Sequence, residues 1–410
     1  MRKDKNITSV ISIPLQMGEK SQSVNKPKSF LTAKWRFEST LAVILMMVGI
    51  LIVLPRQSLA QTNNCWPSFR ANQELTGYTP VSIGNSIKLK WAFKTEDAIK
   101  SSAVVCNNQI YIGSNDGFLY SLSMDGKLMW KFEAKNSIEA APLILDNTIY
   151  FGTLQGDFFA LEAKSGKLRW KYQTDGQISG SAGWIYSPDK KEKWIIVGSY
   201  DFFLHCVNAR TGEMIWKFEA DNYINGAPAT DGKIAIFGGC DGFLHMINVA
   251  DGKEKDKIDV GTYIASSAAI SGDQAFYGNY DGGLYATDLK SKKTLWEYKA
   301  GPFLGSPALA DGKVVIGSQD KNIYCFDQQS GKVLWSFKTQ RKIDGSVVIA
   351  GEKVVFGSGD GRIYVLNLKT GEKIWSYELG AALSSSPAVI NGMIIIGGED
   401  GIVYGFSTGN

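Results

Sequence analysis

The chain has 410 residues, with 44 glycines, 12% aromatic residues and a formal net charge of +4 at pH 7. Residues 1–60 hold nine basic and three acidic residues, so the remaining chain has a net charge of −2. This balance excludes the basic surface that nucleic-acid binding requires, and no nucleic acid is expected as a partner. The length alone suggests two or three domains, whereas a closed ring of repeats forms one domain of about 350 residues.

The first 60 residues are predicted to be a leader. The stretch 41–54, LAVILMMVGILIVL, is wholly apolar and follows a basic segment. It suits the apolar core of a signal peptide, because a membrane span needs about 20 residues. Ser58 and Ala60 place small residues at the −3 and −1 positions of a cleavage site before Gln61. The sequence therefore predicts an exported protein, periplasmic or extracytoplasmic, with two alternatives left open: an uncleaved N-terminal anchor and a start at Met17.

Beyond residue 100 the sequence repeats a unit of roughly 40 residues. In the copy at 360–375, DGRIYVLNLKTGEKIW, an Asp-Gly turn leads into an alternating strand, and a Thr-Gly turn leads into a strand that carries Trp375. Two further strands precede each such hairpin. A period of this length built only of strands predicts a β-propeller with four-stranded blades. The copies open at Asp116, Gln155, Asp201, Asp241, Asp281, Asp320, Asp360 and Asp400.

Eight inner strands are expected, and the ends of the chain must close the ring. The eighth blade stops at residue 410 without a tryptophan strand, whereas SIKLKWAF at 86–93 places Trp91 one repeat before Trp130. The predicted fold class is therefore all-β, an eight-bladed β-propeller of four-stranded blades closed by an N-terminal strand that completes the last blade. Asp256 replaces the tryptophan of blade 4, so its outer strand should pack less well. The inner strands are expected near Ile99, Ile138, Ile178, Ile224, Ile264, Leu304, Ile343 and Leu383.

The motifs LEAKSGKLRW and LNLKTGEKIW, with CWPSFRANQELTGYTP before them, resemble the quinoprotein-type (PQQ-like) eight-bladed propeller superfamily over residues 65–410. The length, single domain and leader are most similar to the propeller subunits of the outer-membrane β-barrel assembly machinery. The resemblance implies a non-catalytic scaffold that binds protein partners in the cell envelope. The expected organisation is a leader at 1–60, a strap at 61–86 and a propeller at 87–410. A monomer is expected, with membrane contact only through an uncleaved leader.

The same superfamily implies an alternative function, a dehydrogenase that holds pyrroloquinoline quinone and Ca²⁺ in the central funnel. Such enzymes commonly have adjacent cysteines over the quinone, and some have a CxxCH haem motif; this sequence has neither. Under this alternative Glu139 and Asn225 are candidate Ca²⁺ ligands and Asp344 is a candidate general base. Under the scaffold interpretation no cofactor, metal site or catalytic residue is expected. Carbohydrate binding is a third interpretation, which rests on aromatic residues at the rim.

One column of the repeat varies while its neighbours stay small, so it is predicted to face the open funnel. Tyr223, Tyr263, Phe303 and Lys342 lie just before it. Mixed charges beside aromatic residues could hold a small ligand or a peptide segment, and the alternative is a solvated channel mouth without a ligand. The column reads Lys100, Glu139, Ser179, Asn225, Ala265, Leu304, Asp344 and Ser384. The predicted ligand-binding residues are Lys100, Glu139, Asn225, Asp344, Tyr223, Tyr263 and Phe303.

The remaining columns are predicted to be structural. His205 and His245 occupy a strand position that aromatic rings fill in the other repeats, so packing is expected rather than metal binding or acid–base chemistry. The tryptophans should join each outer strand to the next blade, and the Asp-Gly pairs should form turns. The five cysteines show no CxxC or adjacent pair and are expected to be buried, unreactive thiols.

Overall fold

The computed structural model describes residues 65–264, 266–390 and 392–409. The chain divides between Leu59 and Ala60, and all described residues belong to the second unit. The predicted leader, its cleavage site and its alternatives lie outside the described residues. No helix that could cross a membrane occurs within the described ranges.

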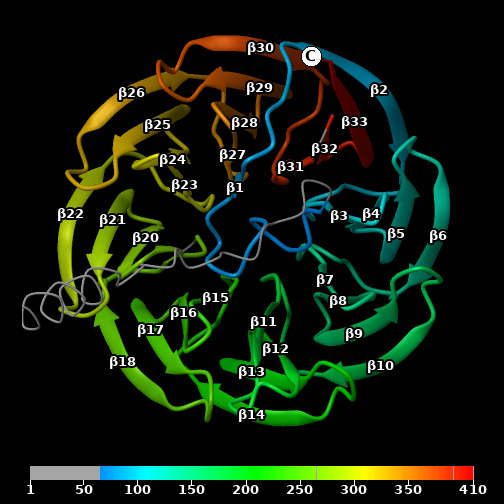
Figure 1. Cartoon of the computed structure of the whole chain (residues 1–410), viewed down its shortest axis with the longest axis vertical. Coiled ribbons are helices and arrows are strands. Elements are labelled where there is room, and N and C mark those ends of the chain that lie inside the picture. Colours follow the sequence, from blue (N-terminus) through cyan, green and yellow to red (C-terminus); the bar gives the residue numbers. More distant parts are fainter. Residues whose placement is uncertain (1–64, 265, 391, 410) are drawn as a thin grey trace, which may run out of the picture. The chain divides into compact units, whose positions relative to one another are not determined.

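Eight sheets form a closed ring, as predicted (Figure 1). The strands of each blade run antiparallel from the centre outward in chain order, except in blade 8. Blades 1 to 4 comprise β3 (Val104–Cys106), β4 (Gln109–Gly113), β5 (Phe118–Ser123) and β6 (Leu128–Glu133); β7 (Leu143–Leu145), β8 (Thr148–Gly152), β9 (Asp157–Glu162) and β10 (Leu168–Gln173); β11 (Gly183–Tyr186), β12 (Lys193–Gly198), β13 (Phe203–Asn208) and β14 (Met214–Glu219); and β15 (Ala229–Thr230), β16 (Ile234–Gly238), β17 (Phe243–Asn248) and β18 (Glu254–Asp259).

Blades 5 to 8 continue the ring. They comprise β19 (Ala269–Ser271), β20 (Gln274–Gly278), β21 (Gly283–Asp288) and β22 (Lys293–Lys299); β23 (Ala308–Ala310), β24 (Lys313–Gly317), β25 (Asn322–Asp327) and β26 (Val333–Lys338); β27 (Val348–Ala350), β28 (Lys353–Gly357), β29 (Arg362–Asn367) and β30 (Lys373–Glu378); and β31 (Ala388–Ile390), β32 (Met393–Gly397) and β33 (Ile402–Gly409), with β2 (Ser86–Lys94) as the outermost strand of blade 8. The short strand β1 (Tyr78–Thr79) adds to blade 7.

The ends of the chain meet in blade 8. Strand β2 pairs antiparallel with β33, so that Trp91 lies opposite Gly405. The pairing supplies the outer strand that the last repeat lacks, and it removes a free sheet edge. At the centre of the ring, the backbone N–H of Ser386 in blade 8 donates to the hydroxyl of Ser102 in blade 1 at 2.9 Å. The ring is therefore closed at its outer and inner circumferences.

Tryptophans hold most of the blade boundaries together, as the sequence predicted. Trp216 in β14 packs on the turn glycine Gly252 of blade 4, and its indole Nε1 donates to the carbonyl of Val249 at 3.1 Å. Gly252 has φ +70°, and a Cβ there would lie 2.6 Å from the indole ring, so only glycine fits. Equivalent indole bonds to a carbonyl of the next blade are made by Trp91, Trp130, Trp170, Trp296 and Trp335.

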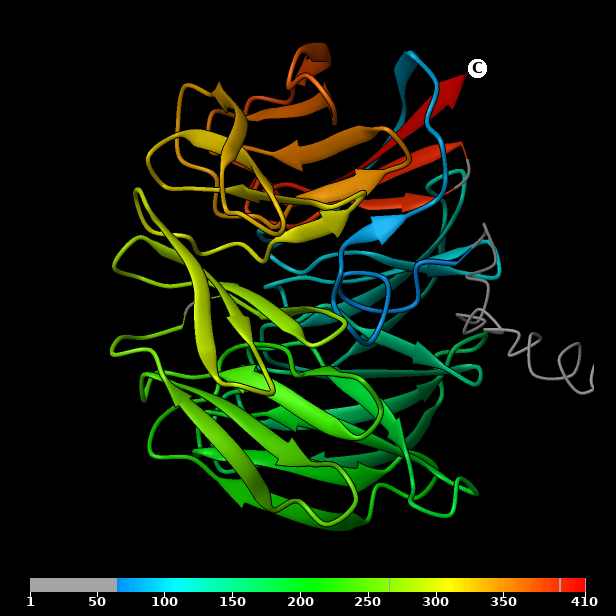
Figure 2. The same ribbon diagram turned by 60° about the vertical axis from the view of Figure 1, so that its left-hand side comes forward.

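The segment before β2 crosses the centre of the ring, drawn in blue in Figures 1 and 2. Its backbone carbonyls accept hydrogen bonds from the inner strands of six blades, so it closes one mouth of the channel. These bonds run from Val105 to Trp66, Ile144 to Pro67, Thr230 to Gln73, Ile270 to Glu74, Leu309 to Thr76 and Ile349 to Gly77, at 2.7–2.9 Å. The described part of the predicted strap therefore covers one end of the channel. We call residues 65–85 the strap.

The cysteine prediction was wrong for one pair. Cys65 at the start of the strap and Cys106 at the end of β3 form a disulfide bond. They are 41 residues apart in the sequence, and an antiparallel bridge between Trp66 and Val105 brings them together. Cys206 and Cys325 are buried free thiols, and burial raises the pKa of each, as expected of unreactive cysteines.

Candidate functional site at the funnel and its rim

The variable column lines a cavity at the centre of the ring. The cavity has a volume of about 180 Å³, and the strap residue Phe69 also lines it. The described members of the column that line it are Lys100, Glu139, Ser179, Asn225, Leu304, Asp344 and Ser384. The sequence thus located the funnel-facing positions, whereas their role in ligand binding stays a prediction.

Small residues line the cavity because the blades meet there. A Cβ on Gly180 would lie 2.9 Å from the carbonyl oxygens of Asn225 and Gly226 in the next blade. Serines add hydrogen bonds between blades: the N–H of Ser306 donates to Ser346 Oγ at 2.9 Å, and that of Ser346 donates to Ser386 Oγ at 3.1 Å. The small inner residues therefore pack the blades against one another. The residues of the variable column are not needed for this packing.

The charges of the column are already paired within the protein. Lys100 Nζ lies 2.7 Å from Glu139 Oε1, and Lys342 Nζ lies 2.7 Å from Asp344 Oδ2. Gln319 also donates to Asp344, at 2.8 Å. The hydrogen bond and charge of Asp344 raise the pKa of Lys342. Both carboxylates are therefore partnered before any ligand arrives.

Three polar side-chain atoms of the cavity wall are buried without a hydrogen-bond partner among the described residues. They are Ser179 Oγ, Asn225 Oδ1 and Ser384 Oγ. A buried polar group without a partner costs free energy, so these atoms favour water or a polar group of a ligand in the cavity. The cavity wall is thus mostly polar, and of the aromatic residues named so far only Phe69 lines it.

The aromatic candidates divide into exposed and buried residues. Tyr223 and Tyr263 are 43% and 55% exposed on the rim of the funnel. Phe303 is fully buried in the core between blades 5 and 6, so its prediction as a ligand-binding residue was wrong. It occupies the core position that Ile224 and Ile264 fill in their blades, and Leu304 is the residue that faces the funnel.

The structure adds three rim residues that the sequence analysis missed. Tyr200 stacks on Tyr223 with ring centroids 4.7 Å apart and an interplanar angle of 20°, and Phe202 lies 5.3 Å from Tyr223. Tyr280 donates its backbone N–H to the carbonyl of Tyr263 at 3.1 Å. We call Tyr200, Phe202, Tyr223, Tyr263 and Tyr280 the aromatic rim. A sequence signal for it existed, because Phe202 stands where most repeats have the turn glycine.

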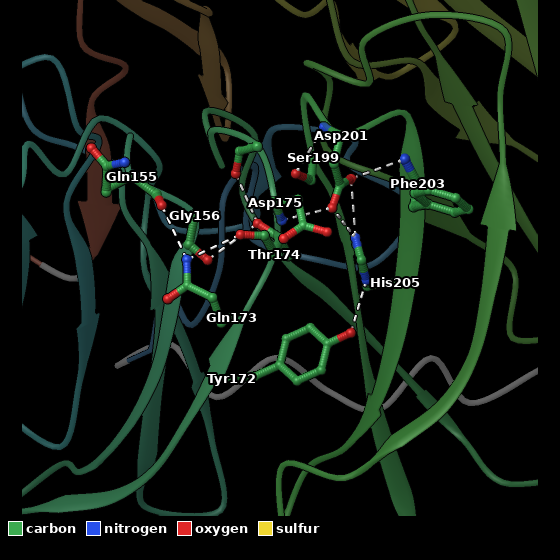
Figure 3. Close-up of polar contacts among 11 residues, drawn as sticks. Gln155, Gly156, Tyr172, Gln173, Thr174, Asp175, Ser199, Asp201, Phe203 and His205 are labelled. Carbon is green, nitrogen blue, oxygen red and sulfur yellow. Dashed lines mark hydrogen bonds and ion pairs between the residues drawn. The ribbon is translucent and has the colours of Figure 1, made fainter.

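The two histidines are structural, as expected. In Figure 3, His205 Nε2 donates to Asp201 at 3.0 Å, and Tyr172 of blade 2 donates to His205 Nδ1 at 3.0 Å. Asp201 also accepts the backbone N–H groups of Phe203 and Asp175 at 3.0 and 3.1 Å, so it caps its turn and ties it to the blade before (Figure 3). The equivalent aspartates 116, 320, 360 and 400 accept the hydroxyl of a tyrosine four residues on.

His245 differs because both of its ring nitrogens face carboxylates. Nε2 lies 2.7 Å from Asp241 and Nδ1 lies 2.7 Å from Glu254. Burial alone would lower the pKa of His245, but the hydrogen bonds and charges of Asp241 and Glu254 outweigh it and raise the pKa. Since a carboxylate only accepts hydrogen bonds, both contacts are satisfied when both ring nitrogens donate, and this geometry favours the imidazolium form.

A bound quinone with calcium does not fit these residues. Glu139 and Asp344 are each held by a lysine, and they lie on blades 2 and 7, with blades 8 and 1 between them. The cavity of about 180 Å³ is closed below by the strap and is smaller than the roughly 300 Å³ at the lower end of cofactor sites. Among the described residues, no group of three or more His, Cys, Asp or Glu side chains could hold a metal ion.

Comparisons with known proteins agree with the fold. Residues 178–410 match the family model described as the β-propeller of the β-alanine-activating enzyme, and residues 120–233 match that of the β-propeller domain of glucose, ethanol and alcohol dehydrogenases. No curated protein matches the sequence.

Solved structures of similar architecture include an alcohol dehydrogenase and a designed protein. BamB from Moraxella catarrhalis has a TM-score of 0.68 at 20% identity, covering 78% of this chain and 100% of that chain. The quinohemoprotein alcohol dehydrogenase from Comamonas testosteroni has a TM-score of 0.72 at 13% identity, covering 84% and 80%. The computationally designed Ika8 protein has a TM-score of 0.67 at 18% identity, covering 77% and 98%. At these identities the likeness shows the fold alone.

Proposed function

The chain belongs to the β-propeller family described for the β-alanine-activating enzyme, with PQQ-type repeats, and we propose that it is an exported, non-catalytic scaffold that binds protein partners. The observation that carries this proposal is the contrast between the funnel and its rim. The funnel is closed at one end by the strap and its charges are paired internally, whereas the rim exposes large aromatic side chains. Exposed aromatic clusters are characteristic of protein interfaces.

The disulfide between Cys65 and Cys106 supports the proposed export. Disulfides persist in oxidising compartments such as the periplasm and are rare in the cytosol. Together with the predicted leader, it favours a mature protein in the cell envelope. The role is then similar to that of the propeller subunits of the outer-membrane assembly machinery, which the sequence resembles.

Photo-crosslinking in cells of the source organism tests the scaffold role. A benzophenone amino acid in place of Tyr263 should crosslink one defined protein, whereas the same group in place of Lys164, on an exposed turn at the outside of blade 2, should not. Crosslinking from neither position, in cells that export the chain, would contradict the proposal.

Calorimetry tests the dehydrogenase alternative. Titration of the full chain with pyrroloquinoline quinone and Ca²⁺ should give no binding heat, because lysines already hold Glu139 and Asp344. Micromolar binding that the double variant Glu139→Ala/Asp344→Ala abolishes would replace the scaffold with a quinone-dependent enzyme.

A further inference from the structure

The aromatic rim is confined to one side of the funnel. Phe202, Tyr223, Tyr263 and Tyr280 are 38%, 43%, 55% and 56% exposed, on the loops of blades 3 to 5. The positions equivalent to Tyr223 and Tyr263 carry no aromatic ring in the other blades; they are Ala98, Ser137, Gln177, Pro302, Lys342 and Ala382. Since the repeat does not require these rings for packing, they are a local addition to the fold.

Phe202 occupies a backbone conformation that favours glycine. Its φ is +76°, and the equivalent turn residues Gly117, Gly242, Gly282, Gly361 and Gly401 also have positive φ. A bulky side chain at positive φ is strained, and such strain concentrates at functional sites. Phe202 exposes its ring despite this strain, which makes the ring a candidate for a functional role. Lys321 in blade 6 has the same φ without an aromatic ring and provides a natural comparison.

Exposed carboxylates accompany the rings. Asp221 lies two residues before Tyr223, Asp281 follows Tyr280, and Asp175 donates its N–H to the turn that carries Phe202. Asp175 and Asp281 make no ion pair within the described residues, whereas Asp221 forms a long ion pair with Lys257, at 3.9 Å. Aromatic faces and free carboxylates both attract cations. An arginine suits both, because its flat guanidinium stacks on rings and donates to carboxylates in pairs.

We propose that the aromatic rim binds an arginine-bearing extended segment of a protein partner. The inference rests on the proposed scaffold function and specifies the chemistry of the partner. Leucine or phenylalanine side chains of the segment would pack against the tyrosine rings, while its guanidinium groups would lie between the rings and Asp221 or Asp281. A neutral glycan could also stack on tyrosines, but it would not need the carboxylates.

Ligand-observed NMR titration of the full chain tests this inference with three probes. The first is the hexapeptide acetyl-Arg-Leu-Arg-Phe-Arg-Leu-amide, the second is the same peptide with citrulline in place of each arginine, and the third is chitotetraose. Citrulline keeps the shape of arginine and removes its charge. We expect the arginine peptide to bind and the citrulline peptide to bind at least about tenfold more weakly, with chitotetraose showing no binding.

The variant Phe202→Gly separates the role of the ring from any effect on folding. It should raise the melting temperature, because it relieves the strained turn. It should also lower the affinity for the arginine peptide about tenfold. The matched control Lys321→Gly should raise the melting temperature in the same way and leave binding unchanged.

Four results would overturn the inference: no binding of the arginine peptide, equal binding of the citrulline peptide, unchanged binding by Phe202→Gly, or binding of chitotetraose that Phe202→Gly abolishes. The last result would make the rim a glycan platform. Peptide binding that meets the expectations, without a crosslinked protein in cells, would leave the site correct and the scaffold role wrong.

Discussion

The outer strands β14 and β18 lie on neighbouring blades and are held by different forces. In β14, MIWKFE, Trp216 is 9% exposed and fills the boundary with blade 4. In β18, EKDKID, Asp256 takes the tryptophan position and pairs with Lys292 of blade 5 at 2.5 Å, while Glu254 pairs with His245. The turn glycine that would receive the indole is also replaced, because Lys292 occupies that turn with φ +60°.

The comparison shows that one architectural joint can be built in two ways. An indole against a glycine gains stability from buried apolar area, which salt and pH hardly affect. An exposed ion pair gains little and is screened by salt, whereas the buried imidazolium depends on its proton. Blade 4 is therefore the part of the ring whose stability should respond to solution conditions.

The largest effect should follow the loss of a whole outer strand. Deleting residues 61–95 removes the strap and β2, leaves the outer edge of β33 without a partner strand and opens one mouth of the channel. We expect a product that aggregates or is rapidly cleaved by protease. A melting temperature equal to that of the intact chain would show that ring closure contributes nothing.

Trp216→Ala should cost about 3–5 kcal/mol in the free energy of unfolding, because it leaves a cavity between two blades and removes the indole bond. Asp256→Ala at the neighbouring boundary should change stability far less, since it removes only an exposed ion pair. Denaturant titration of both variants measures the difference. Equal losses would refute the contrast between the two joints.

Converting one joint into the other provides a constructive test. The double variant Asp256→Trp/Lys292→Gly restores the residues found at six other boundaries and removes a positive φ from a lysine. We expect a gain in stability that is smaller than the Trp216→Ala loss. The gain should persist in 1 M salt, in contrast to the native pair. Calorimetric melting at low and high salt measures it, and a loss of stability would mean that β18 cannot accommodate the indole.

The smallest effect concerns pH. The pKa of His245 is raised in the folded protein, so its contribution is fully present below the unfolded value of about 6.5 and is lost as pH rises through the folded pKa. Above that pH, Asp241 and Glu254 face a neutral ring. His245→Tyr, which installs the residue found in other blades, should flatten this alkaline decline in melting temperature. Parallel curves for the two proteins between pH 6 and 9.5 would contradict the assignment of an imidazolium.

Local repetition made most of the fold predictable from the sequence. The Asp-Gly turns, the tryptophan boundaries and the missing last strand follow from patterns within 40 residues, and the pairing of β2 with β33 follows from counting them. The path of the strap could not be predicted in this way, because the strap is not part of a repeat. Its disulfide therefore remained hidden: nothing in the sequence relates Cys65 to Cys106 more than to the other cysteines.

The site was predictable in part for the same reason. The funnel column follows from the register of the repeat, but two apolar residues in succession, Phe303 and Leu304, allowed the register to slip by one position. The aromatic rim was harder to find from the sequence, because strands β13 and β14 separate Tyr200 and Phe202 from Tyr223. They meet only when the turn of one blade packs beside the first loop of the next.

The pairing of β2 with β33 sets the order in which the protein can mature. A ribosome or a translocation channel delivers β2 first and β33 last, with some 300 residues of chain between the two. Throughout that interval the nine-residue strand β2 has no partner strand, and blade 8 is incomplete beside the other seven blades. The same joint that seals the finished ring is therefore the last to form.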